Sequence, residues 1–355
     1  MTEHRKRAQT PSITSHDVAR AAGVSQSVVS RAFQPNGKIA VKTREKVFEV
    51  ARELGYTPNA FARTLVQQRT RIVGVLMARI DNHFYPKVLE DFTAQLWAAG
   101  RQVMYFGIDD GQDVNTVLQM ALQYRVEAMV VASITLSSHM AEIFSEAGIP
   151  VVLFNRSLST AHGKADVYAV SCDNVHGGAL AADAFLDAGH GRCAFIGGSP
   201  DTSTNQNRKT GFMNALRRRG AELSYAVEKE YSYAWGRSAA RYLLTQDSPP
   251  DAIFCASDLI ALGALDTARA ELALRVPEDV AVIGFDDIEA AGWLGYQLTT
   301  VRQPIDLMLA ETLAITTGNR KEKTEQVTLA VTLVSRTTTR TNVASSSVRP
   351  EEVMR

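Results

Sequence analysis

A short stretch near the start of the chain, VSQSVVSRAF, gathers amide, hydroxyl and guanidinium groups on one side of a predicted helix. Gln26, Ser27 and Arg31 lie on this side, while Val28 and Val29 belong to an apolar stripe on another. Glutamine and arginine form paired hydrogen bonds with the edges of adenine and guanine in the major groove of DNA. The polar face is therefore suited to reading a base sequence, and ordinary solvation is the alternative.

Three helix signals precede this face in the sequence. Thr14 and Asp17 have the spacing of a capping box, which predicts the start of a helix. Gly23 predicts the end of that helix, because glycine readily adopts the left-handed backbone found there. Ser25 is placed to cap the next helix. Two short helices joined by such a turn form the helix-turn-helix pattern, whose second helix enters the major groove.

A third predicted helix, VKTREKVFEVARELGY, would close a three-helix core through Val47, Val50 and Leu54. A small helical bundle without a DNA role would share this core. The charge of the chain favours DNA binding, because residues 1–71 hold 13 Lys and Arg against 5 Asp and Glu, whereas the whole chain holds 38 of each. A basic head on an acidic body is typical of a nucleic-acid-binding module attached to a second function.

The segment 58–70 is predicted to be a hinge. Pro58 suits the first turn of a helix, and the residues that follow it have room for two turns, too few to be stable alone. Leu65 lies in a basic stretch, and a leucine on such a helix can wedge between base steps in the minor groove. Packing of Leu65 on the body is the alternative.

The segments HDVARAAGVSQSVVSRAF and TREKVFEVARELGYTPNAFARTL resemble the DNA-binding head and hinge of the lactose-repressor (LacI/GalR-type) family of bacterial transcription regulators. The resemblance implies that the polar face contacts bases and that Leu65 is the minor-groove wedge. Val28 departs from the usual threonine, and Ala40 departs from a serine that caps the third helix, a loss that typically costs about 1 kcal/mol. The DNA-binding residues that we expect are Ser25, Gln26, Ser27, Arg31, Thr43, Asn59, Arg63 and Leu65.

From Arg71 onward, short apolar runs alternate with helical segments. Continuous hydrophobic runs such as IVGVLMA, AMVVAS and AVIGFD are typical of parallel strands that are buried on both faces. The alternation restarts after DNVHGGALAADAFLDAGH, so we predict an α/β fold with two lobes of doubly wound parallel sheet. Ligands in such folds bind at the carboxyl ends of the strands, which here means the cleft between the lobes.

The resemblance continues through the body to about Thr339, in segments such as RKTGFMNAL and ALRVPEDVAVIGFDD. It implies a periplasmic-binding-protein-like body in which the chain crosses between the lobes three times. We expect the third crossing after Pro304, with a helix at 305–317 in the first lobe and a last strand near 326–335 in the second. The predicted organisation is a helix-turn-helix domain at 1–57, a hinge helix and linker at 58–70, an effector-binding and dimerisation domain at 71–340 and a disordered tail at 341–355.

The same resemblance implies effector contacts at strand ends that face the cleft. Arg208 is expected to be a charged clamp, because a guanidinium donates paired hydrogen bonds to hydroxyls or to a carboxylate. Asp286 is expected to accept hydrogen bonds from sugar hydroxyls, and Tyr231 to stack on a ring. The alternative for Arg208 is an arginine on the surface without a ligand, and the alternative for Asp286 is a carboxylate that caps a structural element. The effector contacts that we expect are Phe84, Tyr85, Asn155, Arg156, Arg208, Tyr231, Ser257 and Asp286.

Other classes of protein are disfavoured. The sequence has no GxGxxG, GxxxxGK[ST], GxSxG or HExxH motif, and its histidines lack metal-ligand spacing, so we expect no enzyme, catalytic residue, metal site or cofactor. It has neither the pattern of a signal peptide nor an apolar run of membrane-spanning length. Cys172, Cys193 and Cys255 are odd in number and lack CxxC spacing, which predicts reduced thiols in a cytoplasmic protein.

These observations predict a ligand-responsive transcription regulator that binds operator DNA. We expect a homodimer, because the tail lacks the leucine heptads that could assemble a tetramer. We also expect a repressor that a sugar or sugar acid releases from a palindromic operator. A purine-like co-repressor is the alternative effector, and a solute-binding protein without a DNA role is disfavoured by the basic head.

Overall fold

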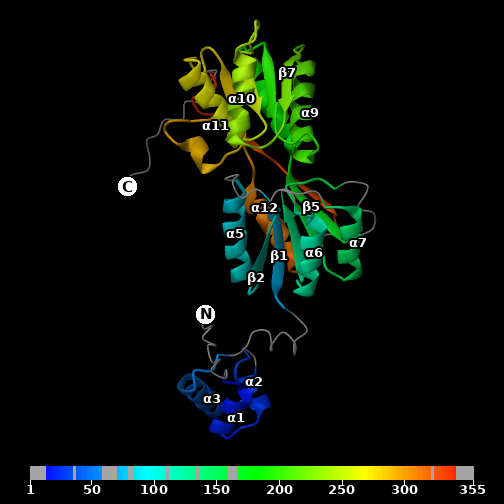
Figure 1. The fold of residues 1–355 in the computed structure, drawn as a ribbon, viewed down its shortest axis with the longest axis vertical. Coiled ribbons are helices and arrows are strands. Elements are labelled where there is room, and N and C mark those ends of the chain that lie inside the picture. The colour runs from blue at the N-terminus through cyan, green and yellow to red at the C-terminus, as the bar shows by residue number, and fades with distance from the viewer. Residues whose placement is uncertain are drawn as a thin grey trace, which may run out of the picture. The chain divides into compact units, whose positions relative to one another are not determined.

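The computed structural model describes residues 13–34, 37–57, 70–78, 84–108, 112–132, 136–158, 166–320 and 324–340. The chain forms two compact units, Met1–Thr70 and Arg71–Arg355, each of which is described by itself (Figure 1). Within the described residues, no helix has both the length and the apolar composition needed to cross a bilayer.

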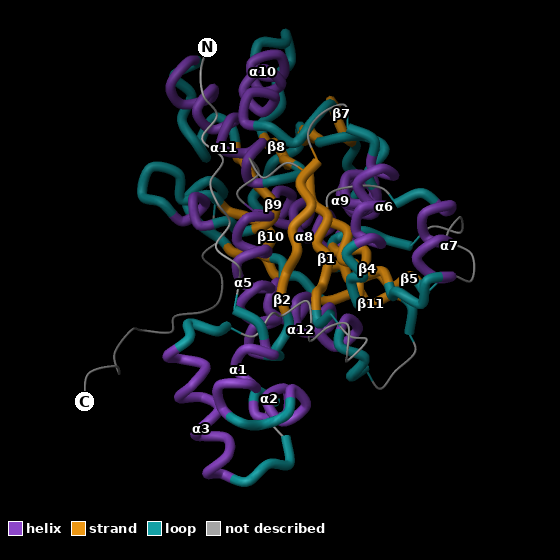
Figure 2. Tube along the Cα trace, turned by 60° about the horizontal axis from the view of Figure 1, so that its bottom comes forward, coloured by secondary structure: helices purple, strands orange, loops and turns teal. Residues whose placement is uncertain are grey.

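The first unit contains three short helices (Figure 2). Their buried side chains form a small apolar core. They are α1 (Ser15–Ala22), α2 (Gln26–Ala32) and α3 (Val41–Glu53). The predicted capping box opens α1: Asp17 N donates to Thr14 Oγ1 (3.4 Å), and Thr14 N donates to Asp17 Oδ2 (3.0 Å). The helix ends at Gly23, whose φ of 66° is the left-handed conformation that glycine adopts at little cost.

The starts of α2 and α3 have no side-chain cap from the described residues. Ser25 occupies the N-cap position of α2, but its hydroxyl pairs with the Ser27 hydroxyl (2.9 Å), so the predicted cap is wrong. Ala40 precedes α3 and has no group that could cap it. Both helices therefore depend on packing, in which Val47 is fully buried and Leu54 lies against the same core.

The second unit has two lobes, each built on a six-stranded sheet. The elements of the first lobe are β1 (Ile72–Ala78), α5 (Phe84–Ala98), β2 (Gln102–Ile108), α6 (Val114–Gln123), β3 (Ala128–Ala132), α7 (Ser138–Glu146), β4 (Val151–Phe154), β5 (Val167–Cys172), α12 (Ile305–Thr316) and β11 (Gln326–Leu329). The sheet order is β11-β5-β4-β3-β1-β2, with every pair parallel. Side chains of α5 and α12 share one buried cluster with β3, while those of α6 and α7 share another, because strand side chains alternate between faces.

The second lobe repeats this doubly wound plan. Its elements are α8 (Asn174–Asp187), β6 (Cys193–Gly197), α9 (Ser203–Arg218), β7 (Leu223–Glu228), α10 (Tyr233–Leu244), β8 (Ala252–Cys255), α11 (Asp258–Asp266) with a π-helical extension (Thr267–Glu271), β9 (Ala281–Asp286), a 3-10 turn (Glu289–Gly292), β10 (Thr299–Arg302) and β12 (Thr332–Val334). The sheet order is β12-β10-β9-β8-β6-β7, and β12 runs antiparallel to β10. α8 packs with α9, and α10 packs with α11. In Figure 1, α10 and α11 lie on one side of this lobe and α9 on the other.

The chain crosses between the lobes three times: between β5 and α8, between β10 and α12, and between β11 and β12. α12 lies in the first lobe, as predicted, but the crossing next to Pro304 is the second and not the third. The single last strand predicted near 326–335 is also wrong. Gln326–Leu329 extends the first-lobe sheet alongside β5, and only Thr332–Val334 joins the second lobe.

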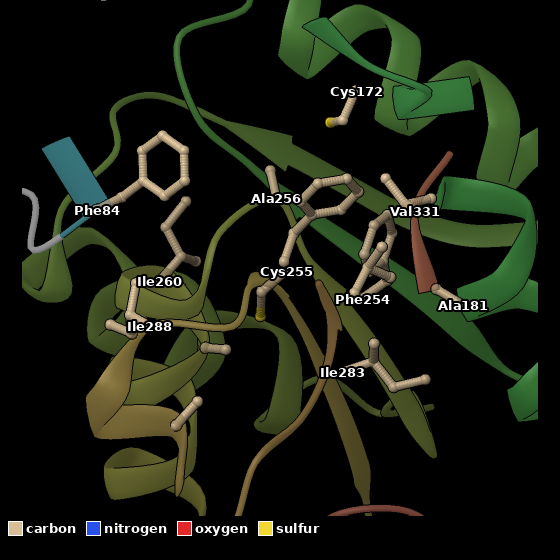
Figure 3. Close-up of a cluster of buried hydrophobic side chains, with 14 of the residues drawn as sticks. Phe84, Cys172, Ala181, Phe254, Cys255, Ala256, Ile260, Ile283, Ile288 and Val331 are labelled. Atoms are coloured by element: carbon tan, nitrogen blue, oxygen red, sulfur yellow. The ribbon is translucent and has the colours of Figure 1, made fainter. Parts of the chain in front are cut away.

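A continuous apolar cluster fills the second lobe and reaches the first. Figure 3 shows part of it around β8, where Phe254 and Cys255 point to opposite sides of the strand. The free thiols of Cys172, Cys193 and Cys255 are all buried, and burial raises the pKa of Cys172 and of Cys193 to about 12. Thiols with such pKa values stay protonated and unreactive at neutral pH.

Close packing of α8 on α9 determines where the start of α9 lies. A Cβ atom on Gly211 of α9 would lie only 1.9 Å from the Val175 carbonyl oxygen of α8. The two helix backbones can approach to this extent only because the position is a glycine. Arg208, one turn before Gly211, is thereby held over the ends of the strands.

Candidate DNA-reading face and effector cavity

The polar side of α2 faces solvent. Gln26, Ser27 and Arg31 are exposed, whereas Val29 and Ala32 on the other side are buried in the core of the first unit. The apolar stripe therefore fixes the orientation of the helix, and the groups that can bond to base edges remain accessible.

The exposed side chains of α2 are held by weak local hydrogen bonds. Gln26 Nε2 donates to Ser15 Oγ at the start of α1 (3.2 Å), and Arg31 Nε donates to the Ser27 carbonyl oxygen (3.2 Å). Hydrogen bonds between exposed groups exchange with water at little net cost. Both side chains can therefore turn towards a base without a large penalty.

The other predicted DNA contacts divide into two groups. Ser25 is exposed at the start of α2, and Thr43 is half-buried in the first turn of α3. Asn59, Arg63 and Leu65 lie outside the described residues. The base and phosphate contacts of all these residues remain predictions.

A cavity that is partly open to solvent is lined by residues of both lobes. Seven of the eight residues predicted to contact an effector lie around it, although their binding role stays a prediction. They are Phe84, Tyr85, Asn155, Arg156, Arg208, Tyr231 and Asp286.

The eighth predicted residue, Ser257, is not among the described residues that line the cavity. It is buried at the N-cap of α11, where its hydroxyl accepts from Ile260 N (3.3 Å). Sequence reasoning missed three hydroxyl residues of the lining, Ser199, Thr202 and Thr204. Their signal was available, because Ser199 and Thr202 lie in the loop that follows β6, at the carboxyl end of a strand, and Thr204 lies in the first turn of the next helix.

Arg208 is the most constrained charged group of the cavity, with 2% of its surface exposed. Nε donates to Asn174 Oδ1 (2.8 Å), Nη1 donates to the Ala256 carbonyl oxygen (2.5 Å), and Nη1 lies 3.5 Å from Asp286 Oδ1. Burial raises the pKa of Asp286 to about 6, an effect that Arg208 and the amide of Gln303 oppose. At neutral pH the pair therefore presents a carboxylate next to a fixed guanidinium.

The backbone that carries Asp286 is strained. Its φ is 124° and that of Asp287 is 57°, both in the left-handed region. The buried carboxyl of Asp258 stabilises this turn. It accepts hydrogen bonds from Ile288 N (2.9 Å) and from Thr300 Oγ1 (2.5 Å). Burial, followed by the charge of Asp286, raises the pKa of Asp258 to about 8, so this carboxyl is mainly neutral at pH 7.

The first lobe contributes Asn155 and Arg156 from the end of β4. Asn155 has a φ of 56°, and its carbonyl oxygen accepts from Arg156 Nη1 (2.8 Å). The next residue links the lobes, since Ser157 N donates to Ser203 Oγ (3.2 Å) and Ser157 Oγ accepts from Asn207 Nδ2 (3.4 Å). These contacts hold the end of β4 against the start of α9.

The lining of the cavity is suited to a polar ligand that contains a ring. It combines guanidinium, carboxylate and hydroxyl groups with the aromatic rings of Phe84, Tyr85 and Tyr231. In the described part of the chain, no three His, Cys, Asp or Glu side chains come together in a way that could hold a metal ion. The chemistry that this arrangement supports is recognition.

Comparison with known proteins identifies the family. The family model of the bacterial regulatory proteins of the lacI family matches residues 14–59, and that of the periplasmic binding protein-like domain matches residues 182–339. Catabolite control protein A of Priestia megaterium is 33% identical over 82% of this chain and 88% of its own length. The chain belongs to the LacI family of bacterial regulatory proteins. The predicted family and fold class are thus confirmed.

Solved structures extend the likeness of this LacI-family chain to the whole fold. A lac repressor dimer bound to operator and the anti-inducer ONPF is 25% identical, with a TM-score of 0.81, over 92% of this chain and 99% of that one. The regulator CelR in complex with cellobiose is 30% identical, with a TM-score of 0.67, over 92% and 99%. The function predicted from the sequence, a transcription regulator, is the function of the family.

Proposed function

We propose that this LacI-family protein is a cytoplasmic repressor that binds a palindromic operator as a homodimer and releases it when a sugar-class effector fills the cavity. One observation carries the proposal: a single chain combines the exposed polar face of α2 with a cavity lined by seven predicted effector contacts. The similar lac repressor, which is bound to operator, supports DNA as one ligand. The similar CelR, which is bound to cellobiose, supports a sugar as the other. The chain then acts by binding alone and is not an enzyme.

Coupling between the two sites follows from the position of the cavity. A ligand that contacts Arg156 in the first lobe and Arg208 in the second favours the lobe arrangement in which it touches both. In the arrangement of the lobes seen here, Ser157 of the first lobe is hydrogen-bonded to α9 of the second. Since β1 of the first lobe begins at Ile72, directly after the first unit, a shift of that lobe acts on the segment that leads to the head.

A DNA-binding experiment tests the first half of the proposal. Full-length protein would be used to select fragments from a genomic library at low salt, and the selected sites would be measured by gel shift. Arg31→Ala should lose about 1–3 kcal/mol of discrimination at one base position, and Arg217→Ala, an exposed arginine on α9, should bind as the wild type does. Failure to enrich any fragment would contradict the proposal.

A ligand screen tests the second half. A ligand at 100 times its dissociation constant stabilises the native state by about 2.7 kcal/mol, which a thermal-shift assay detects. Sugars and nucleobases would be screened, and each hit would be added to the gel shift. A sugar-class hit should release the operator. A purine that tightens operator binding would contradict the sugar effector and favour the co-repressor alternative.

A further inference from the structure

One end of the cavity contains a buried cation that is not fully paired. Arg156 lines the cavity with only 9% of its surface exposed, and its Nη1 donates to the Asn155 carbonyl oxygen. Its Nε has no hydrogen-bond partner among the described residues. A buried guanidinium with an open donor is costly unless a bound group completes its hydrogen bonds.

The start of α9 lies at the same cavity and favours negative charge. Thr202 occupies the N-cap position, but its side chain does not cap the helix within the described residues, because its hydroxyl donates to the Ser199 carbonyl oxygen (2.8 Å). Ser199, Thr202 and Thr204 all line the cavity. The first turn of a 16-residue helix carries a partial positive charge and amide donors that no carbonyl within the helix accepts, and both suit an anion.

The charges of the lining do not balance. Among the described residues of the lining, Arg156 and Arg208 are opposed by one carboxylate, that of Asp286. Asp286 is already committed to Arg208, with Nη1 at 3.5 Å, and to the amide of Gln303 at 2.7 Å. Asp258, the acid behind it, is mainly neutral because burial raises its pKa to about 8. The cavity therefore holds one unpaired positive charge, and it lies at the Arg156 end.

We propose that the effector is an acidic sugar whose anionic group binds Arg156 and the first turn of α9, while its hydroxyls face Arg208 and Asp286. This inference rests on the proposed function, because it names the class of ligand for the same cavity. The shared chemistry is an acid group, either a carboxylate or a phosphate. A neutral sugar would leave the Arg156 charge buried without a counter-ion, whereas an acid group adds charge-assisted hydrogen bonds.

The test compares ligands that differ in one group. D-glucuronate and D-galacturonate carry a carboxylate where D-glucose and D-galactose carry a hydroxymethyl, and the two hexose 6-phosphates carry a phosphate ester on that hydroxymethyl. Calorimetric titration of each into the full-length protein gives the dissociation constants. At least one acid should bind at least tenfold more tightly than its neutral parent, and the carboxylate and phosphate arms show which acid group is preferred.

Variants locate the acid group. Arg156→Gln should erase the preference for the acid, and Arg156→Lys, which keeps the charge, should retain part of it. Arg218→Gln, the same change at an exposed position on α9, should leave the preference intact. Sodium sulfate is an acid group without a sugar, and relative to sodium chloride of equal ionic strength it should raise the melting temperature of the wild type more than that of Arg156→Gln, because the general stabilisation by sulfate is common to both proteins.

Two results overturn the inference: a neutral sugar that binds as tightly as its acid, or an Arg156→Gln variant that keeps the preference. If no acid binds and sulfate stabilises the wild type no more than Arg156→Gln, the inference is also lost. Sulfate stabilisation that depends on Arg156 supports the acid subsite even where these hexuronates do not fit. If selected operators bind but acids show no advantage, this inference alone fails. If acids bind through Arg156 but no DNA is selected, the proposed repressor function alone fails.

Discussion

The guanidinium of Arg208 lies over the ring of Phe285, with its Cζ atom 3.6 Å from the ring centroid. This contact adds a cation–π interaction to the hydrogen bonds that Arg208 makes with Asn174 and Ala256. Asn174 is fixed in turn, since its Nδ2 donates to the Cys172 carbonyl oxygen (3.0 Å). The clamp is therefore in position before a ligand arrives, which lowers the entropy cost of binding.

Arg208→Lys should abolish most of the effector response although it keeps the charge. A lysine ammonium cannot reproduce the planar stack on Phe285 or the fork of donors, so we expect effector affinity to fall at least tenfold. The measurement is calorimetric titration with whichever sugar the screen identifies. Arg217→Lys on the exposed side of α9 is the control and should bind normally. Unchanged affinity in Arg208→Lys would remove this residue from the site.

Asp258→Asn should make the stability of the body less dependent on pH. The native carboxyl stays protonated up to about pH 8, whereas the unfolded one ionises near its ordinary value of about 4. Between these values the native state binds the extra proton, so this group lowers stability as pH rises, by at most about 1.4 kcal/mol per pH unit. Asparagine imitates the protonated acid and does not titrate.

The stability difference between Asp258→Asn and the wild type should therefore move in favour of the variant from pH 5 to pH 8 and level off above that. Calorimetric unfolding of both proteins across this range measures it. The control is Asp247→Asn, a change at an exposed acid on the surface of the second lobe. A difference that is constant with pH, or that moves against the variant, would contradict a neutral buried Asp258.

Gly211→Ala should strongly destabilise the body. Its new Cβ atom would lie 1.9 Å from the Val175 carbonyl oxygen, so α8 and α9 would have to separate, at a cost of about 3 kcal/mol. Gly191→Ala is the matched control, because its Cβ would meet no described atom within 4 Å, and it should stay within about 0.5 kcal/mol of the wild type. Differential scanning calorimetry of the full-length chain measures both. Equal melting temperatures for the two variants would mean that α8 and α9 are not so close.

Substitutions at the N-caps of α1 and α3 should change the stability of the head in opposite directions. Thr14→Ala removes the capping box of α1 and should cost about 1 kcal/mol, whereas Ala40→Ser supplies the missing cap of α3 and should gain about the same. Hydrogen exchange of the α1 and α3 amides in the full-length chain reports each change locally. Slower exchange in Thr14→Ala, or faster exchange in Ala40→Ser, would contradict the capping assignments.

Much of the fold could be predicted because its signals are local. Runs such as 281–285 are continuously apolar since both faces of a parallel sheet are covered, and this pattern marks a strand without knowledge of its neighbours. The general position of the cavity could be predicted as well, because strand ends converge at one edge of a doubly wound sheet. The individual effector contacts required the family resemblance, and Arg208 most of all, since it lies within a helix.

Other features depend on contacts between distant segments and could not be predicted. The run 326–335 is one uninterrupted stretch rich in strand-forming residues, and only pairing with β5 on one side and β10 on the other divides it between two lobes. Ser257 looks like any polar residue at a strand end, but the direction of α11 turns its hydroxyl into a cap. The open Nε of Arg156 is likewise a property of its surroundings and not of its neighbours in the chain.

The return of the chain to the first lobe has a consequence for synthesis on the ribosome. α12 and β11 complete that lobe, yet they are translated after nearly all of the second. A nascent chain that ends before Ile305 therefore lacks both the edge strand beside β5 and the helix that covers one face of the sheet. The first lobe exposes apolar surface until nearly the whole chain has been made, the condition in which unfinished chains are prone to aggregate.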